Sequence, residues 1–210
     1  MDTGEAIFAL ASGQGRAGVA VVRISGGVAG SVFPALTDRP PPPPRHATLR
    51  RLTRPADGAP LDDALCLWFP GPASFTGEDV AELHVHGGPS VIAAVTDVLA
   101  TLPNFRPAEA GEFTRRAFQH GKLDLTAVEG LADLIDADTE AARTRALWQM
   151  QGGMSRIYAG WQADLLEALA LAEATLDFSD EPIPETLDDE LRARILAVQA
   201  SIEPHLGLSE

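Results

Sequence analysis

The fold of this chain is most constrained by the stretch Phe69–Pro89, which reads FPGPASFTGEDVAELHVHGGP. Turns that contain glycine and proline bracket one short strand, Asp79–His86, in which apolar and polar residues alternate. Successive side chains of a strand leave its two faces in turn. One face therefore carries the apolar row Ala81, Leu83 and Val85, and the other carries Val80, Glu82, His84 and His86. The apolar row predicts a buried face, and the opposite row, with one carboxylate and two imidazoles, is a candidate site.

The residues after this strand, Gly87-Gly88-Pro89, predict a turn that leads into a helix. Glycine adopts backbone conformations that are closed to other residues, and proline fits the first turn of a helix. Apolar residues then recur at helical spacing, at Val91, Ile92, Val95 and Leu99. A strand, a glycine turn and a helix start in this order form a place where ligands often bind.

Three separated segments of the chain resemble, in the same order, the signatures of one known family. They are GRAGVAVVRISG at Gly15–Gly26, FPGPASFTGEDVAELHVHGG at Phe69–Gly88 and AGEFTRRAFQHGKLDLTAVEGLADLIDA at Ala110–Ala137. This family is the tRNA-modification GTPases known as MnmE or TrmE. The likeness covers nearly the whole chain and implies that these 210 residues are the front of a longer protein.

The order of the patterns predicts an α+β chain. We expect an N-terminal α/β domain with a mixed or antiparallel sheet over residues 1–118, followed by an all-α segment over residues 119–210, because no later stretch resembles a strand. The resemblance implies that the first domain binds tetrahydrofolate and forms a homodimer. It also implies that the second is the first, incomplete part of a helical domain.

Arg23, Glu82 and Lys122 are the candidate site residues. Arg23 interrupts an apolar strand, where a guanidinium is costly to bury unless a carboxylate or an anionic ligand pairs with it. Glu82 can provide that carboxylate, and the alternative is an edge-strand arginine that reaches water. Lys122 is the single lysine among sixteen basic residues, so it either meets a need for a compact amine or simply survives an arginine-rich composition.

The resemblance assigns a ligand to these three residues. The family's N-terminal domain binds a tetrahydrofolate derivative, in the 5-formyl or 5,10-methylene form. Its site residues fall on Arg23 in VVRISG, Glu82 in DVAELH and Lys122 in HGKLDL. The chemistry is consistent, because a carboxylate accepts hydrogen bonds from the amino-pyrimidinone edge of a pterin and cations suit ring oxygens or a glutamate tail.

The resemblance also implies the activity of the whole protein. The family modifies the wobble uridine of certain tRNAs at C5, with folate carrying the one-carbon unit and with the flavoprotein MnmG (GidA) as partner. GTP, Mg and K belong to a separate GTPase domain. Because no G-x-x-x-x-G-K-S/T occurs in the 210 residues, we expect that they neither bind nor hydrolyse GTP.

The charge of the chain is unevenly distributed. Residues 1–117 hold 12 acids and 10 bases, whereas residues 118–210 hold 18 acids and 6 bases. RNA binding normally needs a basic surface, so we expect tRNA to bind only through the full complex. The one basic cluster is Arg45, Arg50, Arg51 and Arg54, which is either solvated surface or an RNA-phosphate contact.

Two further functions remain open. His84 and His86, near Asp79, Glu82 and His120, resemble the ligand pair of a metal-dependent hydrolase. Three or four converging ligands are needed, however, and only two are spaced to suit, so we assign no metal ligand. The other alternative is a dimerisation or scaffolding module without a bound cofactor.

The cysteine content and the lengths of the apolar runs indicate the cellular compartment. Cys66 is the single cysteine and lies in an apolar run, which fits a buried side chain in a reducing compartment. No apolar run approaches the roughly 20 residues that span a bilayer, and no basic segment precedes an apolar core at the N-terminus. We therefore expect a cytoplasmic protein with no membrane partner.

Helix signals dominate the second part of the chain. Thr126–Glu129 has the pattern of a capping box, which predicts a helix start there. Apolar positions from Leu147 to Leu176 predict one long helix, kinked at Gly152-Gly153 and ended by Pro182 and Pro184. A further helix is predicted up to Pro204. Such helices enclose little core, so we expect them to pack on other helices or on a second copy.

Overall fold

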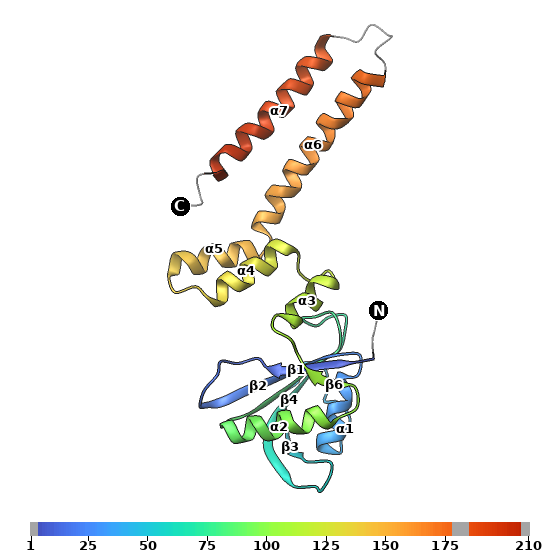
Figure 1. Ribbon diagram of the computed structural model, residues 1–210, viewed down its shortest axis with the longest axis vertical. Helices are drawn as coiled ribbons and strands as arrows, with labels where there is room; N and C mark the ends of the chain where they lie inside the picture. The colour runs from blue at the N-terminus through green and yellow to red at the C-terminus, as the bar shows by residue number, and fades with distance from the viewer. Residues whose placement is uncertain (1–3, 178–184, 207–210) are drawn as a thin grey trace. The chain divides into compact units, whose positions relative to one another are not determined.

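The computed structural model describes residues 4–177 and 185–206, and the chain divides into two compact units, residues 1–123 and 124–210 (Figure 1). The first unit contains a six-stranded sheet with helices, and the described residues of the second are helical apart from turns. The predicted α+β class, with a sheet domain followed by a helical one, is confirmed.

The sheet of the first unit is mixed. Its strands lie in the order β3-β4-β5-β2-β1-β6, and every neighbouring pair is antiparallel except β1 with β6. The strands are β1 (Ala6–Leu10), β2 (Ala17–Gly26), β3 (Thr48–Thr53), β4 (Pro60–Phe69), β5 (Val80–Gly87) and β6 (Phe105–Pro107). The chain therefore places β2 and β5, which are more than fifty residues apart, side by side in the middle.

Two helices, α1 (Val32–Thr37) and α2 (Pro89–Thr101), pack on one face of this sheet. The core that they share with the strands includes Val22, Ile24, Leu83, Val85, Phe33, Leu36, Val95 and Leu99. Cys66 lies in this core, as predicted, and burial raises the pKa of its thiol to about 11.

The alternation predicted for the central strand is confirmed. Ala81, Leu83 and Val85 are at most 1% exposed, whereas Glu82 is only partly buried on the opposite face. Val80 is buried as well, although it lies on that opposite face, because its cross-strand neighbour Ser25 is covered by the loop that follows β4.

The turn after β5 needs its first glycine. A Cβ atom on Gly87 would lie 2.5 Å from the carbonyl oxygen of Ala17 on β2, which is closer than any side chain tolerates. Pro89 lies in the first turn of α2, where its missing N–H is not needed. The predicted sequence of strand, glycine turn and helix is therefore confirmed.

Two segments cover part of the other sheet face. The first is the loop of residues 70–79, between β4 and β5, and the second is α3 (Glu112–Gln119), which follows β6. The helix ends at His120 and Gly121, whose φ of +65° is readily adopted by glycine.

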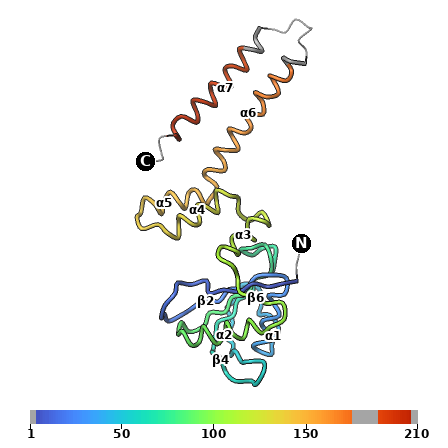
Figure 2. The backbone as a smooth tube through the Cα atoms, viewed as in Figure 1, coloured from blue at the N-terminus to red at the C-terminus, as the bar shows by residue number. Residues whose placement is uncertain are grey.

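The second unit contains α4 (Leu125–Ile135), α5 (Glu140–Met150), α6 (Gly153–Asp177) and α7 (Glu185–Leu206). Helices α4 and α5 contact each other, and α6 and α7 run side by side (Figure 2). None of the helices in the described ranges combines the length and apolar character needed to cross a bilayer.

The predicted capping box is wrong. Helix α4 begins one residue before Thr126, and its N-cap is Asp124, whose Oδ1 accepts the backbone N–H of Ala127 at 2.8 Å. The Thr126 hydroxyl donates to the same carboxylate at 2.9 Å. The N-cap is therefore the carboxylate of Asp124, which caps the Ala127 amide, whereas a capping box at Thr126 would have capped the amide of Glu129.

Two predicted helix boundaries are also wrong. Leu147 belongs to α5, which ends at Met150, and Gly152 with φ of +81° separates it from α6, so the chain breaks where a kink was expected. Helix α7 continues through Pro204 to Leu206. Proline in a last turn removes only one backbone hydrogen bond, which explains why it does not end the helix there. Pro182 and the predicted helix end around it lie outside the described residues.

Candidate functional site

Arg23 and Glu82 lie directly opposite each other on the adjacent strands β2 and β5. Nε of Arg23 donates to Oε1 of Glu82 at 2.9 Å, and Nη2 lies 2.9 Å from the same oxygen. Both strands are in the middle of the sheet, so the alternative of an edge-strand arginine is wrong. Arg23 instead has the carboxylate partner that a partly buried guanidinium needs.

The pair projects from the sheet face opposite the helical core. The side chain of Arg23 is 28% exposed and that of Glu82 is 15% exposed. The strand registers place Val21, Leu65, Leu67 and His84 on the same face. Leu65 is 43% exposed, so this part of the face is open to solvent beside the pair.

His84 forms a hydrogen bond with the second oxygen of the same carboxylate. Its Nε2 lies 3.2 Å from Oε2 of Glu82, while Arg23 bonds Oε1. A carboxylate offers about four lone-pair positions, so Glu82 keeps capacity to accept an N–H from a ligand. The arrangement is an oriented, partly buried acceptor on an open sheet face.

The other histidines bond in different directions. Nδ1 of His86 lies 2.7 Å from Oδ1 of Asp62, and Nδ1 of His120 lies 2.8 Å from the carbonyl oxygen of Thr76. Within the part of the chain that the structure describes, no group of three or more His, Cys, Asp or Glu side chains could hold a metal ion. The metal-hydrolase alternative therefore has no converging ligand set there.

An aromatic ring lies against Arg23. The guanidinium carbon of Arg23 is 5.4 Å from the centre of the Phe75 ring, a separation typical of a cation–π contact. Phe75 belongs to the loop of residues 70–79 and is 38% exposed. Sequence reasoning missed it, because a lone aromatic residue in an aperiodic loop carries no signal of what it contacts.

Lys122 contacts the same loop. Its Nζ donates to the carbonyl oxygen of Pro72 at 2.8 Å, and among the described residues it makes no hydrogen bond or ion pair with Arg23 or Glu82. An ammonium has three N–H donors, so two remain for an anionic group. The structure thus brings Arg23 and Glu82 together and places the ammonium of Lys122 against the loop that carries Phe75.

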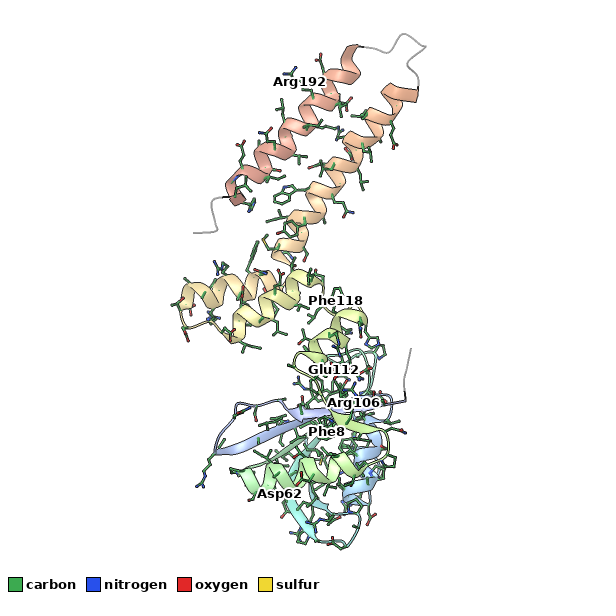
Figure 3. All side chains as sticks on the ribbon, viewed as in Figure 1. Phe8, Asp62, Arg106, Glu112, Phe118 and Arg192 are labelled. Carbon is green, nitrogen blue, oxygen red and sulfur yellow. The ribbon has the colours of Figure 1, made fainter. Side chains whose placement is uncertain are left out.

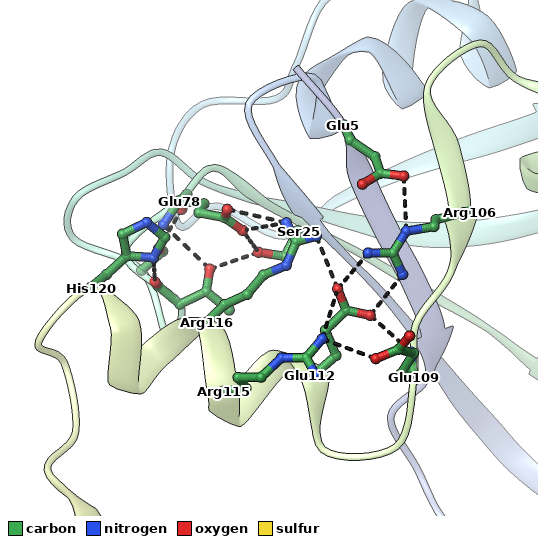
Figure 4. A network of polar contacts seen from close by, with 11 residues as sticks. Glu5, Ser25, Glu78, Arg106, Glu109, Glu112, Arg115, Arg116 and His120 are labelled. Carbon is green, nitrogen blue, oxygen red and sulfur yellow. Dashed lines mark hydrogen bonds and ion pairs between the residues drawn. The ribbon is translucent and has the colours of Figure 1, made fainter. Parts of the chain in front are cut away.

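A second cluster of charges fastens α3 to the sheet (Figures 3 and 4). We call it the α3 clamp, and it consists of Glu78, Arg106, Glu112 and Arg116. Glu112 is 2% exposed and accepts from Arg106 at 2.6 and 2.8 Å and from Arg116 at 3.1 Å. The hydrogen bonds from Arg106 lower the pKa of Glu112 to about 2. Arg116 also donates to both oxygens of Glu78 at 3.1 Å.

The clamp is not an anion site. It borders a hollow of about 750 Å³, but its arginines are already paired with carboxylates. Glu5 and Glu109 add further acceptors, for Arg106 and Arg115. Sequence reasoning missed the clamp, although the i, i+4 spacing of Glu112 and Arg116 was a signal that could have revealed part of it.

The four arginines between residues 45 and 54 do not form one basic surface. Arg50 is 9% exposed, donates to the carbonyl oxygen of Pro40 at 2.7 Å and faces the Phe33 ring. The prediction of a solvated side chain is wrong for Arg50, because strand alternation turns it towards α1. The others bond to nearby acceptors: Arg45 to the Ala73 carbonyl, Arg51 to Asp63 and Arg54 to Asp57.

Two family models match the chain. One is described as GTP-binding protein TrmE N-terminus and matches residues 6–122, and the other is described as MnmE helical domain and matches residues 125–210. Together they cover nearly all of the sequence.

Known proteins of high identity agree with these matches. A tRNA modification GTPase MnmE of Parvibaculum lavamentivorans is 54% identical over 202 residues, which are 96% of this chain and 46% of the relative. The mitochondrial 5-taurinomethyluridine-[tRNA] synthase subunit GTPB3 of Homo sapiens is 52% identical over 206 residues, 97% of this chain and 42% of the relative. The chain therefore spans less than half the length of these relatives.

Proposed function

Since the chain belongs to the family of tRNA modification GTPases named MnmE or TrmE, we propose that its first unit binds a one-carbon derivative of tetrahydrofolate. The observation that carries this proposal is the Arg23–Glu82 pair, an oriented carboxylate on an open sheet face. Folate in the 5-formyl or 5,10-methylene form offers the polar ring edge and the carboxylate tail that such a site can hold.

Each of the three residues has its own role in the proposal. Glu82 accepts N–H groups from the amino-pyrimidinone edge, because its Oε2 keeps acceptor capacity. Arg23 holds Glu82 in place and offers its remaining N–H groups to a ring oxygen. Lys122 meets the negative charge of the glutamate tail with the two donors that Pro72 does not use.

The activity of the full-length members of the family is proposed for this protein in the same way. The bound folate supplies a one-carbon unit for C5 modification of the wobble uridine of tRNA. GTP, with Mg and K, acts in a GTPase domain, the flavoprotein MnmG (GidA) is the partner, and tRNA binds through the full complex. We propose the cytoplasm as the location of this activity.

A homodimer is part of the same proposal. Two apolar side chains that project on the open sheet face, Leu49 and Leu65, are 67% and 43% exposed, which supports a second copy covering them. Sedimentation of the purified chain at micromolar concentration should give the mass of a dimer. A strict monomer would contradict this part of the proposal.

Calorimetric titration tests the folate site. The unaltered chain should bind 5-formyltetrahydrofolate, and Glu82→Gln should weaken binding without changing the melting temperature by more than a few degrees. Asp97→Asn on α2 makes the same change of charge on the exposed surface of a helix and should leave affinity unchanged. A scaffolding module, which the exposed apolar face also supports, predicts no heat of folate binding in any of these proteins.

A further inference from the structure

Phe75 is an exposed aromatic residue on a stretch of backbone that is held by hydrogen bonds from other parts of the chain. It lies in the loop of residues 70–79, whose backbone is bonded from outside at three carbonyl groups. Arg45 donates to the carbonyl oxygen of Ala73, His120 to that of Thr76 and Lys122 to that of Pro72. The loop also bonds itself, because the N–H of Gly71 donates to Asp79 at 2.8 Å.

The loop is also closely packed. Gly77 has φ of +81°, and a Cβ atom there would lie 2.9 Å from Cβ of His120. Thr76 directly follows Phe75 in the chain, and its hydroxyl forms a hydrogen bond of 2.7 Å with the hydroxyl of Ser25 on β2. The backbone that carries Phe75 is thus fixed on both sides, yet the ring itself is 38% exposed beside Arg23.

We propose that Phe75 is a ligand-contacting residue of the folate site, and that its ring is the platform on which the planar pyrimidinone half of the pterin stacks. This inference rests on the proposed function. Hydrogen bonds from the edge of a flat ring to Glu82 fix its direction but not the tilt of its plane, so a second contact with the ring face is needed. An aromatic side chain on a fixed backbone, beside the arginine that bonds the carboxylate, provides that contact at a small entropic cost.

The competing explanation, which we call a shelf, is that Phe75 only supports the guanidinium of Arg23 and makes no contact with the ligand. Both explanations predict that Phe75→Leu weakens folate binding, so a single variant does not separate them. A shelf has no role once Arg23 is gone. A platform that touches the ligand keeps its role in an Arg23→Ala background.

The test is a double-variant cycle read by calorimetric titration with 5-formyltetrahydrofolate. Phe75→Leu should weaken binding about tenfold, as expected for loss of one stacked aromatic contact, both alone and combined with Arg23→Ala. Phe75→Tyr keeps the ring and should retain the affinity. Phe75→Trp should add fluorescence that the ligand quenches, whereas a shelf covered by Arg23 should show no such quenching.

The outcomes separate the inference from the function on which it rests. Unchanged affinity in Phe75→Leu, or a loss that disappears in the Arg23→Ala background, overturns the platform. Unchanged affinity in Glu82→Gln overturns the proposed site instead. Melting curves of each variant identify those that fail to fold, and Phe75→Tyr then decides the case, because a loss of affinity in that well-folded variant also counts against the platform.

Discussion

Oε1 of Glu82 accepts the Nε hydrogen of Arg23 at 2.9 Å across the two central strands, while Oε2 of the same carboxylate faces His84. The carboxylate is therefore oriented by protein groups on both oxygens. Because the carboxylate is already oriented, ligand binding has to order fewer side-chain conformations and costs less entropy. Its consequences for stability and binding can be measured separately.

The Arg23–Glu82 pair should contribute to stability. Arg23→Ala leaves a carboxylate that is only 15% exposed without its main partner, so we expect the free energy of unfolding to fall by about 1 to 2 kcal/mol. The matched control is Arg51→Ala, which removes an equally short cross-strand pair with Asp63 on an exposed surface and should change little. Urea unfolding measures both, and equal effects would contradict the role of burial.

Glu82 and Lys122 should differ in their contribution to folate affinity. Glu82→Ala removes a partly buried charged acceptor, which is worth roughly 1.5 to 3 kcal/mol, or about one to two decades in Kd. Lys122→Ala should cost less, because this ammonium is exposed, and its effect should shrink as salt is added. Titrations at low and high ionic strength measure the ranking, and a larger effect at Lys122 would reverse it.

The stability of the first unit should depend on pH through Glu112. Its pKa of about 2 lies below its ordinary value of 4.5, so its stabilising effect is present above pH 4.5 and is lost as the pH falls towards 2. Glu112→Gln should lower the free energy of unfolding at neutral pH by about 2 kcal/mol. The difference from the unaltered chain should vanish in acid.

The control for this prediction is Glu109→Gln. Glu109 is 68% exposed and pairs with Arg115 at 3.0 Å, so its replacement should leave the pH profile nearly unchanged. Denaturant unfolding at a series of pH values compares the two variants. If the free energy of unfolding of Glu112→Gln is still reduced at pH 2, the substitution acts by disturbing packing and not by removing a charge.

Gly87→Ala should destabilise the sheet. The added Cβ would lie 2.5 Å from the carbonyl oxygen of Ala17, so β2 and β5 must separate, at a cost of about 1 to 3 kcal/mol. Gly88→Ala is the matched control, because its φ is −79° and its nearest contact would be 3.9 Å from Val91. Melting temperatures of the two variants give the test, and equal temperatures would contradict the close approach.

The cap of α4 should reside in Asp124 and not in the expected capping box. Asp124→Ala removes the acceptor for the Ala127 N–H and should lower stability by about 1 kcal/mol. Glu129→Ala removes the acceptor side chain of that box and should have much less effect. Circular dichroism during thermal unfolding compares the two variants, and a loss in Glu129→Ala as large as in Asp124→Ala would support the capping box.

Much of the first unit was predictable because its signals are local. The alternation around Glu82 fixes which side chains face the core, and Gly87-Gly88-Pro89 fixes where the strand ends and α2 begins. The helix boundaries in the second unit were less predictable. There, Asp124 and Thr126 are both good capping residues, and only the backbone conformation decides between them.

The α3 clamp and the surroundings of Arg50 were not predictable from local pattern. Arg116 and Glu78 are 38 positions apart in the chain, and nothing in either neighbourhood specifies the other. Arg50 looks like a surface residue beside Arg51, yet the segment after α1 supplies it with the Pro40 carbonyl and α1 supplies the Phe33 ring. Partners of this kind are chosen by packing between elements.

The sequence by itself determined the α+β class, the central strand, the helix after it and three candidate residues, because side-chain periodicity and turn chemistry act within a few residues. The tertiary structure decided which strands are neighbours and in what register. That register sets Arg23 opposite Glu82 across 59 positions of sequence and brings Phe75 to Arg23. Contacts between distant segments depend on how whole elements pack, so only the folded chain shows which of the predicted residues meet.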